Sequence, residues 1–108
     1  MADKNELDTI TSEIRRYLSN EYGQRLQGIY LFGSHGRGHA AIESDIDIAV
    51  VLKERESRFV ERQRCSEFIS DLSLEYNVVI QLIFLDEREF ESQQYALFRN
   101  IRNEGIPV

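Results

Sequence analysis

The hydrophobic positions along the chain follow two different patterns, and the changes from one pattern to the other divide the sequence into six elements. Apolar residues three and four apart, such as Ile10, Ile14 and Leu18, predict amphipathic helices, whereas short continuous apolar runs predict buried strands. The predicted elements are a helix over 3–21, strands over 26–32 and 45–52, a helix over about 55–76, a strand over 78–85 and a last helix marked by Phe90, Leu97, Phe98 and Ile101.

The order of these elements predicts a small α/β (α+β) domain with helices packed on at least one face of a short sheet. The connection between the first two strands is too short for a helical crossover, so these strands are expected to be antiparallel and the sheet mixed. Gly23 is expected to end the first helix, and Gly105 to stand at the C′ position of the last. No repeat or linker divides the chain, so residues 1–108 are predicted to form a single domain.

Composition and charge narrow the functional classes. The 108 residues carry 13 Lys+Arg against 19 Asp+Glu, a formal net charge of −6, which argues against a generic basic nucleic-acid-binding protein. The single cysteine, Cys65, has no partner for an internal disulfide and falls on an apolar stripe, where a core position is expected.

The longest apolar run, 48–52, is too short to cross a membrane and the first residues do not resemble a signal peptide, so a cytoplasmic location is predicted.

A glycine-rich stretch, Gly33-Ser34-His35-Gly36-Arg37-Gly38, follows the first predicted strand and is a candidate phosphate site. Gly33 allows the backbone to approach a ligand closely, and Ser34 with the amides after it offers hydrogen bonds to phosphate oxygens. The spacing matches neither the serine-hydrolase elbow nor a Walker-type phosphate loop. The stretch therefore predicts a phosphate cradle of another type.

The second motif is Asp45-Ile46-Asp47, at the start of the next predicted strand. Residues i and i+2 of a strand point to the same face, about 6.5–7 Å apart, so the two carboxylates are expected side by side. Such charges repel beside an apolar strand unless a cation neutralises them, and oxygen ligands favour Mg²⁺ or Mn²⁺. A metal-binding carboxylate pair beside a phosphate cradle is an arrangement that acts on a nucleoside triphosphate.

Together, Gly33-Ser34-x-x-Arg37-Gly38 and Ser44-Asp45-Ile46-Asp47 resemble the signature of the polymerase-beta-like nucleotidyltransferases, and within them the minimal nucleotidyltransferase (MNT) group. The resemblance covers essentially the whole chain. It implies the polymerase-beta-like fold and Mg²⁺-dependent transfer of AMP, or another nucleoside monophosphate, from ATP or another triphosphate to an acceptor hydroxyl. Because this group is often encoded beside a HEPN-domain toxin, the resemblance also implies an antitoxin that modifies a tyrosine of its partner toxin.

The resemblance further implies roles for individual residues. The nucleotide-binding residues would be Gly33, Ser34 and Arg37. Asp45 and Asp47 would bind the metal ions, and the third carboxylate of the family lies on the following strand, where this chain has Gln81. An amide cannot serve as a general base and is a poorer Mg²⁺ ligand, and Asp86 is about 16 Å further along the strand. Three outcomes stay open: slow transfer, nucleotide binding without turnover, or a group supplied by the acceptor or partner.

Two charged clusters have both a structural and a functional interpretation. The basic run at the start of the long helix is expected to be a solvated face with pairs of opposite charge, or alternatively a rim that attracts triphosphate or RNA. Its basic residues are Lys53, Arg55, Arg58, Arg62 and Arg64. The acidic residues within 86–91 are expected to form the first turn of the last helix, where the helix dipole favours them, or to dock a basic partner.

Two functions of different classes are therefore compatible with the sequence, while a third, transfer to RNA or a small molecule, is disfavoured because 108 residues leave little protein for an acceptor pocket. The first is a nucleotidyltransferase that modifies, and so neutralises, a partner protein. The second is a nucleotide-binding module that neutralises the partner by direct contact, which Gln81 favours. Neither a membrane nor a nucleic acid is expected as a direct partner. The acceptor, the preferred base and a homo-oligomeric state stay open.

Overall fold

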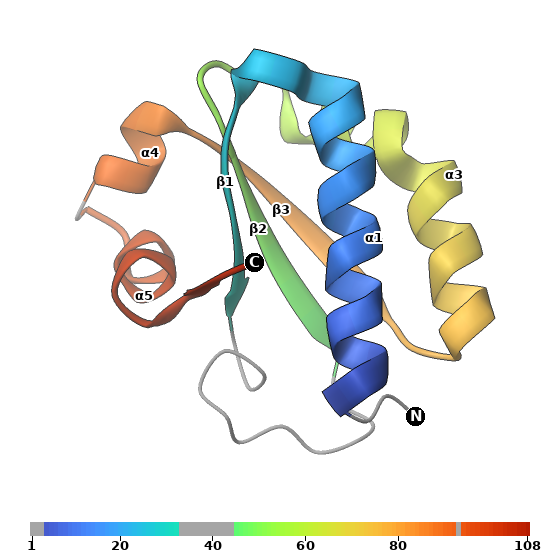
Figure 1. Ribbon diagram of the computed structural model, residues 1–108. Coiled ribbons are helices and arrows are strands. Elements are labelled where there is room, and N and C mark those ends of the chain that lie inside the picture. Colours follow the sequence, from blue (N-terminus) through green and yellow to red (C-terminus); the bar gives the residue numbers. More distant parts are fainter. Residues whose placement is uncertain (1–3, 33–44, 93) are drawn as a thin grey trace.

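The computed structural model describes residues 4–32, 45–92 and 94–108 (Figure 1). The elements in chain order are α1 (Lys4–Tyr22), a 3₁₀ turn η1 (Gly23–Arg25), β1 (Leu26–Phe32), β2 (Ile46–Leu52), α3 (Arg58–Tyr76), β3 (Ile80–Asp86), α4 (Glu87–Glu91), α5 (Ala96–Glu104) and β4 (Ile106–Pro107). The predicted first helix, three strands and long helix are all confirmed, with ends that differ by at most three residues. Gly23 follows α1 with a positive φ of 55°, as its role in ending that helix requires.

The strands form one mixed sheet in the order β3-β2-β1-β4. β1 pairs antiparallel with β2, from Leu26 opposite Leu52 to Phe32 opposite Asp47. β2 pairs parallel with β3 in an unbroken register from Ile46 to Leu52. The predicted mixed α/β architecture is therefore confirmed, and β3 lies at one edge of the sheet.

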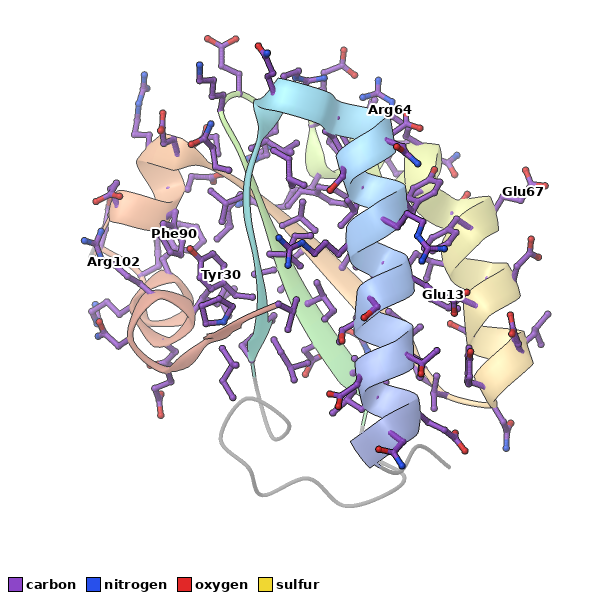
Figure 2. The ribbon with its side chains drawn as sticks, viewed as in Figure 1. Glu13, Tyr30, Arg64, Glu67, Phe90 and Arg102 are labelled. Carbon is purple, nitrogen blue, oxygen red and sulfur yellow. The ribbon has the colours of Figure 1, made fainter. Side chains whose placement is uncertain are left out.

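Helices cover both faces of the sheet (Figure 1). α1 and α3 pack on one face over the larger core, to which Ile14, Leu52 and Phe84 contribute fully buried side chains. α4 and α5 lie on the other face over a smaller core. That smaller core consists of Ala49, Leu85, Phe98 and Ile101, with Tyr30, Phe32, Ile83 and Phe90 packed against it. Figure 2 shows Tyr30 beside Phe90, whose rings stack with their centroids 5.0 Å apart.

The long helix differs from its prediction at its N-terminal end. It begins at Arg58 because the side chain of Ser57 caps it, accepting a hydrogen bond from the Val60 amide. Cys65 is buried as predicted. The apolar pattern of the predicted helix also places Phe59 on the buried stripe, and this prediction is wrong, because Phe59 is 65% exposed. The residue that faces the core in this first turn is Glu61, two positions on and therefore on the opposite side of the helix.

The predicted last helix is in fact two helices. Asp86 and Glu89 form a capping box that starts α4, and the extended backbone of Ser92 ends it before α5 begins. Gly105 does end α5, but with an extended backbone rather than the left-handed one expected at C′. A side chain at Gly105 would place its Cβ 2.5 Å from the Ile101 carbonyl oxygen, so close backbone approach explains this glycine.

The basic run before and within α3 is not simply a solvated face. Arg55 and Arg58 both bind the Glu89 carboxylate of α4, with nitrogen–oxygen distances of 2.8 and 3.0 Å from Arg55 and 2.6 Å from Arg58. Glu89 is also engaged in the capping box, so the acidic turn serves the fold here rather than offering this carboxylate to a basic partner. The pair of arginines ties α4 to the segment that leads into α3.

The Glu89 cluster predicts acid-sensitive stability. Partial burial acts to raise the pKa of Glu89, but hydrogen bonds from Arg55, the Asp86 amide and Arg58 outweigh burial and lower it from 4.5 to about 2. A lowered folded-state pKa stabilises the protein above the unfolded value, and this stabilisation is lost as the pH falls from 4.5 towards 2. Urea midpoints measured across that range should therefore fall more steeply for the wild type than for Glu89→Gln. Glu87→Gln, on an exposed position of the same helix, is the control and should follow the wild-type profile.

Candidate functional site

Asp45 and Asp47 stand at the beginning of β2. Asp45 directly precedes the strand and is exposed, while Asp47 is its second residue and is half-buried. Alternation along the strand places both on the sheet face that carries Ala49 and the α4–α5 core. The predicted proximity of two carboxylates on one face is therefore supported by the placement of β2.

Gln81 comes from the neighbouring strand and reaches the same carboxylates. It is the in-register partner of Asp47 in the parallel β2–β3 pair. Its side chain is exposed, and Nε2 donates a hydrogen bond to Oδ2 of Asp45 over 2.9 Å. Two carboxylates and one amide thus meet at the start of two parallel strands, with the amide oriented by Asp45.

The predicted nucleotide-binding residues Gly33, Ser34 and Arg37 lie outside the described residues. The described part of the chain fixes only where they are attached. β1 ends at Phe32, which is the antiparallel partner of Asp47. The last described residue before the glycine-rich stretch therefore lies next to one of the two carboxylates. Its role in binding phosphate stays a prediction.

Asp86 is the remaining carboxylate on β3, and its position excludes it from the site. It pairs with Leu52 at the far end of the β2–β3 ladder, whereas Gln81 pairs with Asp47. Its Oδ1 accepts a hydrogen bond from the Glu89 amide at 2.7 Å, which caps α4. The five-residue separation spans about 16 Å of strand, so Asp86 cannot replace a carboxylate at position 81.

The side chains at this end of the sheet fit a hard divalent cation. Within residues 4–32, 45–92 and 94–108, no group of three or more His, Cys, Asp and Glu side chains is placed to hold a metal ion. Mg²⁺, however, is usually bound through only one or two carboxylates, with water and substrate phosphates as its other ligands. The Asp45 and Asp47 carboxylates meet that requirement, and Gln81 brings a neutral amide rather than a third charge.

A groove of about 540 Å³ beside Gln81 was not predicted from the sequence. It runs between α3 and the outer edge of β3. Its lining residues are Arg62, Cys65, Ser66, Ile69, Ser70, Ile80, Gln81, Leu82 and Ile83. The sequence carries a weak signal for it, because Arg62, Ser66 and Ser70 recur every four residues and so share one face of the helix. Only the position of β3 at the sheet edge turns that face into one wall of a groove.

The sequence profile of the nucleotidyltransferase domain family matches residues 11–104. The chain belongs to this family. A candidate protein adenylyltransferase from Methanocaldococcus jannaschii is 31% identical over 103 residues, which cover 95% of this chain and 99% of that protein. None of the described helices is both long enough and apolar enough to cross a membrane.

Solved structures of nucleotidyltransferases share this fold. A candidate nucleotidyltransferase from Sulfolobus solfataricus superposes with a TM-score of 0.65 at 25% identity, over 92% of this chain and 76% of that one. A toxin–antitoxin structure with AMP-PNP gives 0.60 at 26% identity, over 91% and 70%. The Shewanella oneidensis complex of a tri-AMPylated HEPN toxin with its MNT antitoxin gives 0.57 at 24% identity, over 93% and 69%. The resemblance to MNT-type nucleotidyltransferases and the predicted fold are therefore confirmed.

Proposed function

We propose that this nucleotidyltransferase moves AMP from ATP to a hydroxyl group of a partner protein, most simply a HEPN-type toxin, and so acts as its antitoxin. The proposal rests on one observation: Asp45, Asp47 and Gln81 lie together at the end of the sheet where β1, β2 and β3 are neighbours. The matched protein adenylyltransferase of M. jannaschii supports a protein acceptor. The toxin–antitoxin structure with AMP-PNP supports an adenine nucleotide and a toxin partner.

In the proposed reaction, the acceptor oxygen attacks the α-phosphorus of ATP. A new oxygen–phosphorus bond forms, the bond from the α-phosphorus to the bridging oxygen breaks, pyrophosphate leaves and the hydroxyl proton is released to water. Asp45 and Asp47 would hold Mg²⁺ or Mn²⁺, which supplies charge neutralisation at the phosphates. Gly33, Ser34 and Arg37 would bind the triphosphate. Gln81 would orient Asp45 through the hydrogen bond that it donates to Oδ2.

The test is transfer of radiolabel from [α-³²P]ATP to the product of the neighbouring gene, in the presence and absence of Mg²⁺. We expect the partner protein to become labelled only when both the metal ion and this chain are present. The same reaction with [γ-³²P]ATP is the control, because AMP transfer retains the α-phosphate and releases the γ-phosphate. Absence of labelling by the wild-type chain, in a complex that is shown to form, would contradict the proposed transfer.

A second function is favoured by Gln81 itself. Because an amide stands where the resemblance places the third carboxylate, the chain could bind a nucleotide and neutralise its partner by contact alone. The two functions differ in one outcome: if Asp45→Asn abolishes neutralisation while the complex persists, contact alone is insufficient.

Gln81→Asp directly tests the position at which the resemblance places the third carboxylate. The substitution puts a third carboxylate beside Asp47 in the register that the sheet fixes, and it adds a metal ligand and a candidate general base. We expect AMP transfer to increase severalfold, measured as initial rate at saturating ATP and Mg²⁺. Gln81→Asn, which has the same length as aspartate but stays neutral, is the matched control. Equal rates for Gln81→Asp and Gln81→Asn would mean that a carboxylate at this position does not assist transfer.

A further inference from the structure

The outer edge of β3 is an uncovered strand edge. β3 is the terminal strand of the sheet, and no described strand pairs with its outer side. Its register with β2 is unbroken, and the sequence Ile80–Asp86 contains neither proline nor lysine. Bulges, prolines and lysines are the usual means by which proteins prevent pairing at an edge. The opposite edge, in contrast, is covered in part by β4, which includes Pro107.

The hydrogen bonds of the sheet show which main-chain groups of β3 face outwards. The Ile46 amide donates to the Val79 carbonyl over 2.8 Å, which sets the phase of the parallel ladder. Because bonding residues alternate, Gln81 and Ile83 bond to β2 while Ile80 and Leu82 direct their N–H and C=O groups away from it. The Asp86 amide, in the same phase as Ile80, indeed bonds to Glu89 rather than to β2. Ile80 and Leu82 line the groove beside α3 and Phe84 does not, so the part of this edge that meets the groove lies at Ile80 and Leu82.

This edge forms one wall of the groove between β3 and α3. A groove between an edge strand and a helix is the geometry in which an extended peptide is bound by strand addition, with main-chain hydrogen bonds supplying affinity. Among the described residues that line the groove, Arg62 carries the one charge. On a protein with a net charge of −6, this local positive charge favours an acidic side chain in the bound segment.

We infer that an extended segment of the acceptor protein adds as a strand to β3 at Ile80 and Leu82, with an acidic side chain at Arg62 and its hydroxyl side chain over Gln81. This inference rests on the proposed function for the identity of the acceptor. An added strand lies about 4.8 Å from β3, with its side chains pointing alternately to the two faces of the sheet. One set therefore extends over Gln81 towards Asp45 and Asp47, and the other set faces α3.

The two faces impose a spacing rule on the acceptor. Gln81 and Ile83 point to the α4–α5 side of the sheet, whereas Ile80 and Leu82 belong to the core beneath α1 and α3. Arg62 belongs to α3 and is therefore on the second side. Because strand side chains alternate, the acidic residue and the acceptor hydroxyl should stand an odd number of positions apart.

The test uses acetylated and amidated nonapeptides of alternating valine and glutamine, with one tyrosine as acceptor and one glutamate placed an odd or an even number of positions from it. Binding to the ¹⁵N-labelled full chain is measured by NMR without nucleotide. We expect the odd-spaced peptides to bind at least about tenfold more tightly, and to slow hydrogen exchange of the Ile80 and Leu82 amides. Methylating alternate main-chain nitrogens of the peptide should abolish binding in one register and not in the other, because only one set faces β3.

Charge exchange at the groove completes the test. Arg62→Glu should weaken binding of the glutamate peptide by about tenfold, and a peptide with lysine in place of glutamate should restore it. Arg16→Glu, on an exposed position of α1, changes the net charge equally and should not alter binding. Failure of every peptide to bind, equal binding of both methylated registers, or protection of Ile80 and Leu82 by a second copy of the chain would overturn the inference.

The experiments distinguish a failure of peptide binding at β3 from a failure of the proposed AMP transfer. Peptides that bind at β3 but accept no label from [α-³²P]ATP would contradict the proposed transfer and leave the docking edge intact. Labelling of the partner protein without protection of the Ile80 and Leu82 amides in the complex would contradict the docking edge and leave the transfer intact.

Discussion

Asp47→Asn is expected to lower AMP transfer by at least about a hundredfold, because even groups one step removed from a metal ion cost about 10–100-fold when they are replaced. Asparagine keeps the size and shape of the side chain but removes the negative charge that would hold the cation. Asp47 also lies between the end of β1 and Gln81 of β3, so no other carboxylate of β2 or β3 occupies the same position. The measurement is the initial rate of label transfer at saturating ATP and Mg²⁺.

Asp45→Asn should show a similar loss and adds a second observation. Oδ2 of Asp45 already accepts the Gln81 amide, so the substitution changes both metal binding and the orientation of Gln81. Circular dichroism and urea unfolding should show that both variants keep the wild-type fold, because the exchanged atoms are isosteric. Asp71→Asn, which changes the same charge on α3 and on an exposed side chain, is the control for net charge. Full activity in both Asp45→Asn and Asp47→Asn would place the reaction elsewhere.

Glu61→Ala is expected to destabilise the fold by about 1–3 kcal/mol, the usual cost of leaving a buried hydrogen-bonding group without its partner. The Glu61 side chain is fully buried. Its Oε1 accepts hydrogen bonds from the Tyr22 hydroxyl at 2.8 Å and from Arg64 at 3.0 Å, while its Oε2 accepts the Glu56 amide at 3.0 Å. Burial, and then the hydrogen bond to Glu61, raise the pKa of Tyr22 and keep its hydroxyl as a donor. The variant therefore leaves the buried Tyr22 hydroxyl and the part-buried Glu56 amide without this acceptor.

The measurement for Glu61→Ala is the free energy of unfolding by urea. Glu67→Ala is the matched control, since Glu67 is exposed on the same helix and Figure 2 shows it pointing away from the body of the protein. We expect the control to stay within about 0.5 kcal/mol of the wild type. A loss below about 1 kcal/mol for Glu61→Ala would mean that the packed carboxylate adds little to stability.

Local sequence patterns were sufficient for most of the fold. The run from Leu26 to Phe32 has the apolar continuity of a buried strand, and its observed bounds are the predicted ones. The short connection to β2 settled that these strands are antiparallel, because a parallel pair needs a longer crossover. The apolar residues of the last third, however, were joined into one helix. Apolar periodicity alone does not reveal the capping box of Asp86 and Glu89 or the extended backbone at Ser92.

The candidate site, like the fold, could be predicted only in part from the sequence. The spacing of Asp45 and Asp47 predicted two neighbouring carboxylates, because alternation along a strand is a local property. The placement of Gln81 beside Asp47 needs the register between two strands that are far apart in sequence, and the structure supplies it. The burial of Glu61 was missed for a related reason. A carboxylate in a charged run is ordinarily exposed, and only the arrival of Tyr22 from α1 and Arg64 from the next turn provides the partners that permit burial.

The sequence by itself determined the elements, the mixed character of the sheet and the residue types of the family motif, because these follow from periodicity, chain connectivity and local chemistry. Only the tertiary structure decided that β3 is an edge strand, that the groove beside α3 reaches Gln81, and that Arg55 and Arg58 are bound to Glu89 rather than free at the surface. Each of these depends on which distant segments pack together. Such packing is set by the burial of apolar faces across the whole chain, not by any one stretch of it.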